Sequence, residues 1–187
     1  LVGLSAHGAI NVRFFQSPAG HSRYVGTAFA ILAGTTFAAL AVALSTATWF
    51  GRWTGLATQW LLLAVLAAAA QAIIHIRLVM WQVNGEALRY GLFQVLQTTL
   101  NLLLSLVLVL AGLGWEGRGA GIAVALLLFA AIGLVSLRRA RFVDWCVDSS
   151  AARDVLRFGV PLVPHVIGTL FIAASDRLMV AKLMSVH

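Results

Sequence analysis

Residues Tyr90–Trp115 read YGLFQVLQTTLNLLLSLVLVLAGLGW, an apolar run without a single charged side chain. A helix needs about 20 mostly apolar residues to cross a bilayer, because each residue adds about 1.5 Å across a hydrocarbon core of about 30 Å. The run is too long for a strand and does not alternate, and an open sheet in lipid would leave backbone groups unpaired. It therefore predicts a transmembrane helix.

Apolar segments of comparable length lie on both sides of this run. They are Tyr24–Gly51, Trp53–Ile76, Gly119–Leu137 and the slightly shorter Phe158–Ser175. Leu1–Val12 is predicted to be the C-terminal end of one more span. We expect an all-α, polytopic transmembrane bundle of about five full spans and a partial one. We also expect it to be a piece of a longer protein.

The composition identifies lipid as the solvent of most of this chain. Of its 187 residues 61% are hydrophobic and 10% are charged, whereas a soluble domain has about 45–50% apolar and about 25% charged residues. The net charge of +7 would suggest nucleic acid in a soluble protein, but these arginines lie between apolar runs and indicate topology instead. The single Cys146 excludes an internal disulfide. The five histidines show no ligand spacing, so we expect neither a metal nor a cofactor.

Positive charge is distributed unevenly between alternate connections. The five predicted connections are Arg13–Arg23, Gly51–Gly55, Trp81–Arg89, Gly112–Gly119 and Arg138–Arg157. The second and fourth carry only Arg52 and Arg118. The first, third and fifth, with the residues beside them, carry nine arginines: Arg13, Arg23, Arg77, Arg89, Arg138, Arg139, Arg141, Arg153 and Arg157. Because Lys and Arg accumulate in cytoplasmic loops, we place these three connections in the cytoplasm.

Tryptophans mark the predicted span ends, where amphipathic rings sit at the headgroup level. They are Trp49, Trp53, Trp60, Trp81 and Trp115.

The fifth connection, residues 138–157, is basic but contains apolar side chains. Phe142, Val143, Cys146, Val155 and Leu156 indicate a helix lying on the membrane surface. We interpret it as a linker and anchor between residues 1–137 and residues 158–187. An active element, such as a gate or a partner site, is the alternative.

Polar side chains follow one face of the central run. They are Gln94, Gln97, Thr98, Asn101 and Ser105, at spacings that place them on one side of a helix. Such a stripe must face other helices or a water-filled cavity. Two interpretations remain open: interhelical hydrogen bonds, at about 0.6 kcal/mol each, or the wall of a hydrophilic cavity.

The preceding span carries Gln71 and His75, which are four residues apart, followed by Arg77. The arginine can extend its side chain to the cytoplasmic headgroups. Alternatively, it contacts an anionic substrate near the mouth of a cavity.

The last apolar segment combines prolines with ionisable residues. Pro161 and Pro164 each remove a backbone donor and predict a break in the helix, a feature of transporter binding sites. His165 and Asp176 fall on one helical face, and Arg177 follows directly. The Asp176–Arg177 pair lines a cavity or anchors the helix at the interface.

Three segments resemble a known family. They are Val12-Arg13-Phe14-Phe15, Gly85–Ser105 and Leu156–Met179, the last with a Gly-x-Pro-x-x-Pro-His start and a Ser-Asp-Arg end. The chain resembles the polysaccharide-transporter branch of the multidrug/oligosaccharidyl-lipid/polysaccharide (MOP) exporter superfamily, which also contains multidrug (MATE-type) exporters and lipid II flippases. On this resemblance the chain runs from the end of the second span into the seventh.

The resemblance implies a part of a two-lobe, 12–14-helix flippase in the bacterial inner membrane. Its cargo would be an undecaprenyl-diphosphate-linked O-antigen or exopolysaccharide repeat unit, moved by alternating access. Partners would be this substrate, membrane lipids and other polysaccharide-assembly proteins. Arginine suits the diphosphate, and amides suit the sugar hydroxyls. The candidate cavity residues are Arg13, Arg77, Gln94, Gln97, Asn101, His165, Asp176 and Arg177.

Two other functions compete with this one. A cation-coupled multidrug exporter needs acids within the membrane, and of the six acids only Asp176 is expected at membrane depth. A membrane-embedded polysaccharide biosynthesis enzyme needs a constellation of catalytic groups in its loops. The predicted loops are too short and too poor in such groups, so we expect no enzyme.

Overall fold

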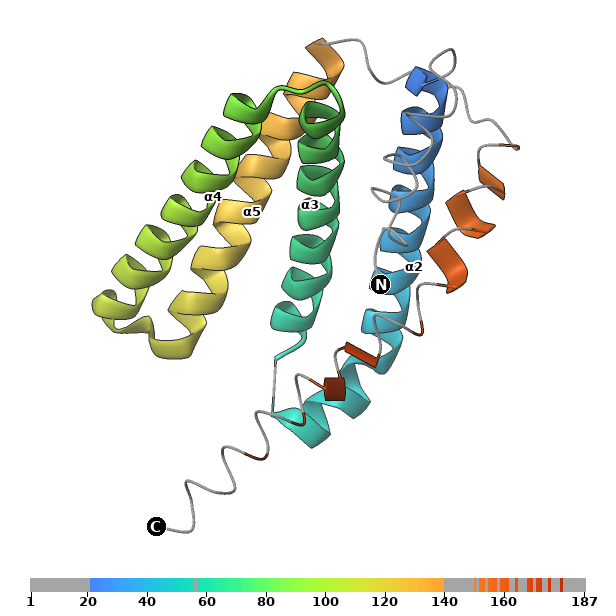
Figure 1. Ribbon diagram of the computed structural model, residues 1–187. Helices are drawn as coiled ribbons and strands as arrows, with labels where there is room; N and C mark the ends of the chain where they lie inside the picture. The colour runs from blue at the N-terminus through green and yellow to red at the C-terminus, as the bar shows by residue number, and fades with distance from the viewer. Residues whose placement is uncertain are drawn as a thin grey trace.

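The structure is a computed structural model that describes residues 21–55 and 57–139 (Figure 1). Beyond them it describes positions 150, 152–153, 155–157, 159–161, 164, 168–169, 171–172, 175 and 179, all of them helical. Over these residues the chain is an all-helical bundle, as its composition predicts.

The helices run up and down through the bundle in chain order. They are α2 (His21–Thr54), α3 (Thr58–Val83), α4 (Ala87–Leu108), the short π-helical turn η1 (Val109–Leu113) and α5 (Gly114–Arg139). Within the described residues, three helical stretches are long and apolar enough to cross a membrane: Val25–Trp49, Thr58–Val83 and Ala87–Arg139. The third stretch folds back on itself between α4 and α5 (Figure 1).

Hydroxyl groups within α2 satisfy their hydrogen-bonding needs on their own helix. Thr36 Oγ1 donates to the Leu32 carbonyl at 2.6 Å, and Thr46 Oγ1 donates to the Val42 carbonyl at 2.7 Å. Backbone carbonyls four residues back are the acceptors that serine and threonine reach in a helix. The polar residues in this apolar segment are therefore compatible with a lipid environment.

A glycine ends α2 later than the sequence predicts. Gly55 has a φ of 70° and donates its N–H to the Gly51 carbonyl at 2.9 Å, the left-handed conformation that terminates many helices. Trp53 therefore belongs to α2, and the prediction that it begins the next span is wrong. The following helix begins at Thr58 and continues to Val83, beyond the predicted end at Ile76.

The predicted turn at Asn84-Gly85 is confirmed. Gly85 has a φ of 72° and donates to the Gln82 carbonyl, while Glu86 donates to the Trp81 carbonyl at 2.9 Å. These two bonds form the Schellman arrangement that closes a helix C-terminus.

The turn between α4 and α5 is shorter than predicted. Gly112 and Gly114 have φ values of 90° and 53°, which side chains with a Cβ rarely adopt, and they reverse the chain direction. Residues 114–119, predicted to lie in the turn, form the start of α5. Trp115 and Arg118 are consequently helical.

Two apolar clusters hold the helices together. One lies between α3, α4 and α5 and is formed by Ala70, Ile74, Leu78, Trp81, Phe93, Leu126, Phe129 and Ala130. The other joins α2, α3 and α5 through Val25, Ala28, Phe29, Leu32, Ile76, Val79, Met80 and Leu137. Val155, from the fifth connection, belongs to this second cluster and is fully buried. It packs on the bundle, whereas the neighbouring Leu156 is exposed.

Replacing Val155 with asparagine is expected to release this connection from the bundle. The amide would be buried without a hydrogen-bond partner, which costs about 1–3 kcal/mol. Trypsin should then cleave after Arg153 and Arg157 at least about fivefold faster, as the local opening equilibrium shifts. Leu156→Asn is the matched control, because its side chain is 41% exposed. Equal cleavage rates for the two variants would contradict the docking of Val155.

Candidate functional site

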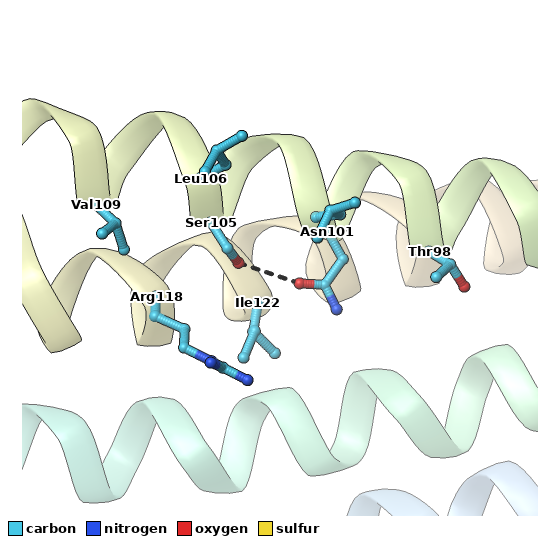
Figure 2. Close-up of a pocket in the computed structure, with 8 residues that line it drawn as sticks. Thr98, Asn101, Ser105, Leu106, Val109, Arg118 and Ile122 are labelled. Carbon is cyan, nitrogen blue, oxygen red and sulfur yellow. Dashed lines mark hydrogen bonds between the residues drawn. The ribbon is translucent and has the colours of Figure 1, made fainter.

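A hollow of 390 Å³ lies along α4, toward its connection with α5 (Figure 2). Its lining combines hydrogen-bonding groups with a cation and apolar side chains. The lining residues are Thr98, Asn101, Leu102, Ser105, Leu106, Val109, Arg118 and Ile122. The first six come from α4 and η1, and the last two come from α5.

The polar groups of the hollow project to one side of the α4–α5 pair. Ser105 Oγ donates to Asn101 Oδ1 at 3.3 Å, and Thr98 Oγ1 donates to the Gln94 carbonyl at 2.9 Å. The Arg118 guanidinium extends from α5 on the same side as Asn101 (Figure 2). An amide, two hydroxyl groups and a guanidinium therefore face one space.

Close backbone packing places Arg118 beside α4. A Cβ added at Gly121 would lie 2.7 Å from Ser105 N, and one at Gly117 would lie 2.8 Å from the Leu108 carbonyl carbon. Small residues four apart allow membrane helices to approach this closely. Arg118 lies between these two glycines in the sequence, so their contact determines its position.

The predicted polar stripe divides in the structure. Thr98, Asn101 and Ser105 line the hollow, Gln94 is exposed, and Gln97 is buried with 7% of its surface accessible. Gln97 lies at one edge of the arc of about 100° that these residues span on α4. One edge of this arc is covered by neighbouring helices.

Arg77 does not reach the headgroups as one interpretation predicts. It is 5% exposed, and its guanidinium carbon lies 4.0 Å from the centre of the Trp81 ring, a cation–π contact. A Cβ added at Gly133 of α5 would lie 3.6 Å from Arg77 Cβ, so the missing side chain leaves room for the arginine. Trp81, predicted as an interfacial aromatic, lies two residues before the end of α3 and is buried against neighbouring helices, with 7% of its surface accessible.

Trp60 and Trp115, two more of the tryptophans predicted at span ends, lie near helix ends. Trp60 and Trp115 pair at 5.3 Å between ring centres, at the ends of α3 and α5 that lie next to the second and fourth connections. In α3, Gln71 and His75 also pair, with 3.0 Å between Nε2 atoms.

Several predicted site residues lie outside the described residues. They are Arg13, His165, Asp176 and Arg177. Pro161 and Pro164 are described, and both have helical backbone. Proline's fixed φ is compatible with a helix, and membrane helices tolerate the missing donor.

Arg118 is the residue of this hollow that the sequence interpretation missed. The sequence predicts a glycine-rich turn at this position, where the charge bears only on topology. The signal that could have identified it is the Gly117-x-x-x-Gly121 spacing, which indicates a packed helix rather than a loop.

The hollow suits an amphiphile that carries both hydroxyl groups and negative charge. Arg118 can bind an anion, Asn101 and Ser105 can bind hydroxyl groups, and Leu102 and Leu106 offer an apolar wall. Among the described residues, no group of three His, Cys, Asp or Glu side chains comes together to hold a metal ion. No protein-family model, curated protein or solved structure matches the chain.

Proposed function

We propose that this chain is part of a membrane transporter that flips undecaprenyl-diphosphate-linked polysaccharide repeat units across the bacterial inner membrane. The observation that supports the proposal best is the hollow along α4, in which Asn101, Ser105 and Arg118 lie beside leucine side chains. A molecule of this cargo class carries hydroxyl-rich sugars, a diphosphate and a polyprenyl chain. Each of these three parts has a chemically matching group in the lining.

The position of Arg118 fits contact with a phosphate at a membrane boundary. It lies about 6 Å along the helix axis from the start of α5 at Gly114. Phosphates of membrane amphiphiles occupy the interfacial layer, which is about 5–8 Å thick on each side of the hydrocarbon core. Toward the membrane centre, Ser105 and Asn101 offer hydrogen bonds to sugar hydroxyls as they pass.

Arg118→Gln is expected to lower export. A charge-assisted hydrogen bond contributes about 1.5–3 kcal/mol, so the loss should reduce surface glycan at least about tenfold. The assay uses a strain that lacks the chromosomal gene and carries either the wild-type or the variant gene. Surface polysaccharide and undecaprenyl-linked repeat units are both quantified, at matched protein levels. Repeat units should accumulate on the cytoplasmic face as surface glycan falls.

Arg52→Gln is the matched control for this experiment. Arg52 is an exposed arginine in the last turn of α2, beside the second connection, and it does not line the hollow. It should restore export as well as the wild type does. Normal glycan together with new drug sensitivity in the deletion strain would reject the proposal in favour of a multidrug exporter. Short, unpolymerised glycan at the surface would reject it in favour of an enzyme.

A further inference from the structure

Three buried polar side chains, on the side of the hollow toward the α3–α4 turn, have atoms without hydrogen-bond partners among the described residues. Arg77 is 5% exposed, and both Trp81 and Gln97 are 7% exposed. Arg77 Nε and Nη1, Trp81 Nε1 and Gln97 Oε1 are buried and make no hydrogen bond to the described residues. Such groups are rare in folded proteins, and a buried donor or acceptor without a hydrogen bond destabilises by about 1–3 kcal/mol. Three of the four atoms are donors, so the cluster has an excess of donors and a positive charge.

Arg77 and Gln97 lie at about the same depth. The rings of Trp81 and Phe93 contact each other across α3 and α4, with 5.1 Å between their centres. Arg77 precedes Trp81 by one helical turn, and Gln97 follows Phe93 by one turn on the antiparallel helix. Both side chains are therefore about 6 Å further from the α3–α4 turn than this ring pair.

Arg77 lies toward the opposite end of the bundle from Arg118. It is about 9 Å along the axis from the end of α3 at Val83, beside the third connection. Arg118 is near the other end of the bundle, beside the α4–α5 turn. The two arginines are separated by about 16 Å along α4, because Gly117 contacts Leu108 while Arg77 is level with Gln97.

Hydrogen-bonding side chains connect these two levels on one face of α4. Gln97, Asn101 and Ser105 follow one another at intervals of four residues. Asn101 and Ser105 line the hollow, whereas Gln97 is buried against neighbouring side chains. The helices α3 and α4 pack mainly against α5 and touch each other little, and α4 diverges from α3 away from their connecting turn (Figure 1).

We infer that Arg77, with Trp81 and Gln97, forms a second binding position for a phosphate group, closed in this conformation and opened by separation of α3 from α4. This inference rests on the proposed function and adds where the cargo's phosphate is held in the cytoplasmic leaflet. The donors match phosphate oxygens. The amphiphile then has one arginine toward each end of the bundle and a row of amides and a hydroxyl between them.

The test measures thermal unfolding of the purified full-length protein in a neutral detergent with added dodecyl phosphate. Dodecanol serves as the uncharged control, and inorganic phosphate distinguishes a free anion from a lipid headgroup. Arg77→Met is expected to raise the unfolding midpoint without ligand by about 2–4 °C, because two buried donor atoms without hydrogen bonds are removed. It is also expected to remove at least half of the stabilisation by dodecyl phosphate. Arg89→Met, an exposed arginine at the same end of the bundle, should leave this stabilisation unchanged.

The results for Arg77→Met and Arg118→Met separate the two proposals. Loss of stabilisation in the Arg118 variant alone would overturn the second position and leave the proposed function in place. Loss of stabilisation in the Arg77 variant alone would support the second position and contradict phosphate binding by Arg118 in the hollow. If inorganic phosphate stabilises the protein as much as dodecyl phosphate does, the site binds a free anion. That result would overturn the inference that it binds the phosphate of a lipid.

A measurement on the wild type keeps the inference testable if a variant does not fold. Phenylglyoxal modifies accessible arginines, and mass spectrometry reports the rate at each site. We expect slow modification of Arg77 through the opened state, and at least a fivefold decrease in that rate with dodecyl phosphate. No modification of Arg77, or modification that dodecyl phosphate does not slow, would overturn the inference.

Discussion

Gly121→Ala is expected to separate α4 from α5 and to destabilise the protein by about 1–3 kcal/mol, the usual cost of overpacking. The new methyl group would lie 2.7 Å from Ser105 N and 2.8 Å from Ser105 Cα. These are backbone atoms, so no side-chain rotation can relieve the contact and the helices themselves must move. Because Ser105 also lines the hollow, transport should fall together with stability. Thermal unfolding in detergent and export in cells measure the two effects.

Gly91→Ala is the matched control on the neighbouring helix. A Cβ at Gly91 would have no heavy atom within 4 Å, and the residue is helical. Alanine is the better helix former by up to about 1 kcal/mol, so this variant should be at least as stable as the wild type. If Gly121→Ala unfolds at the same temperature as Gly91→Ala, the close packing of α4 on α5 is wrong.

Phe93→Ala is expected to destabilise the protein by about 3–5 kcal/mol, the range for removing a buried aromatic ring. The Phe93 ring is 7% exposed and contacts Trp81 and Phe129 in edge-to-face geometry, at 5.1 Å and 4.9 Å between centres. These contacts join α4 to α3 and to α5. The cavity left by alanine would be lined by all three helices, so the variant should lose cooperative unfolding or show a much lower midpoint.

Leu96→Ala tests whether the loss is specific to the buried face. Leu96 lies on the same helix and is 58% exposed, toward the lipid side of the bundle. Its truncation leaves no internal cavity and should change stability by less than about 1 kcal/mol. Comparable losses in the two variants would mean that α4 faces its neighbours differently from the arrangement described.

Local chemistry made much of the helical architecture predictable. Apolar runs such as Tyr90–Trp115 have to be helical in lipid, because only a helix pairs every backbone group within its own segment. The Asn84-Gly85 turn was also predictable, since it depends on the conformational freedom of one glycine. Helix limits were less predictable. The run at Trp53 looks continuous in composition, whereas Gly55 two residues later is the position at which the backbone turns.

The sequence by itself determined that this chain is helical, apolar and rich in arginine between its long runs, because composition and backbone pairing depend on the residues alone. Only the tertiary structure decided where Arg77 and Arg118 lie relative to the neighbouring helices. Arg77 is enclosed because Gly133 of another helix leaves space beside it, and Arg118 reaches the hollow because Gly117 and Gly121 bring α5 against α4. Both outcomes depend on contacts between helices, and a linear pattern of polar and apolar residues does not contain them.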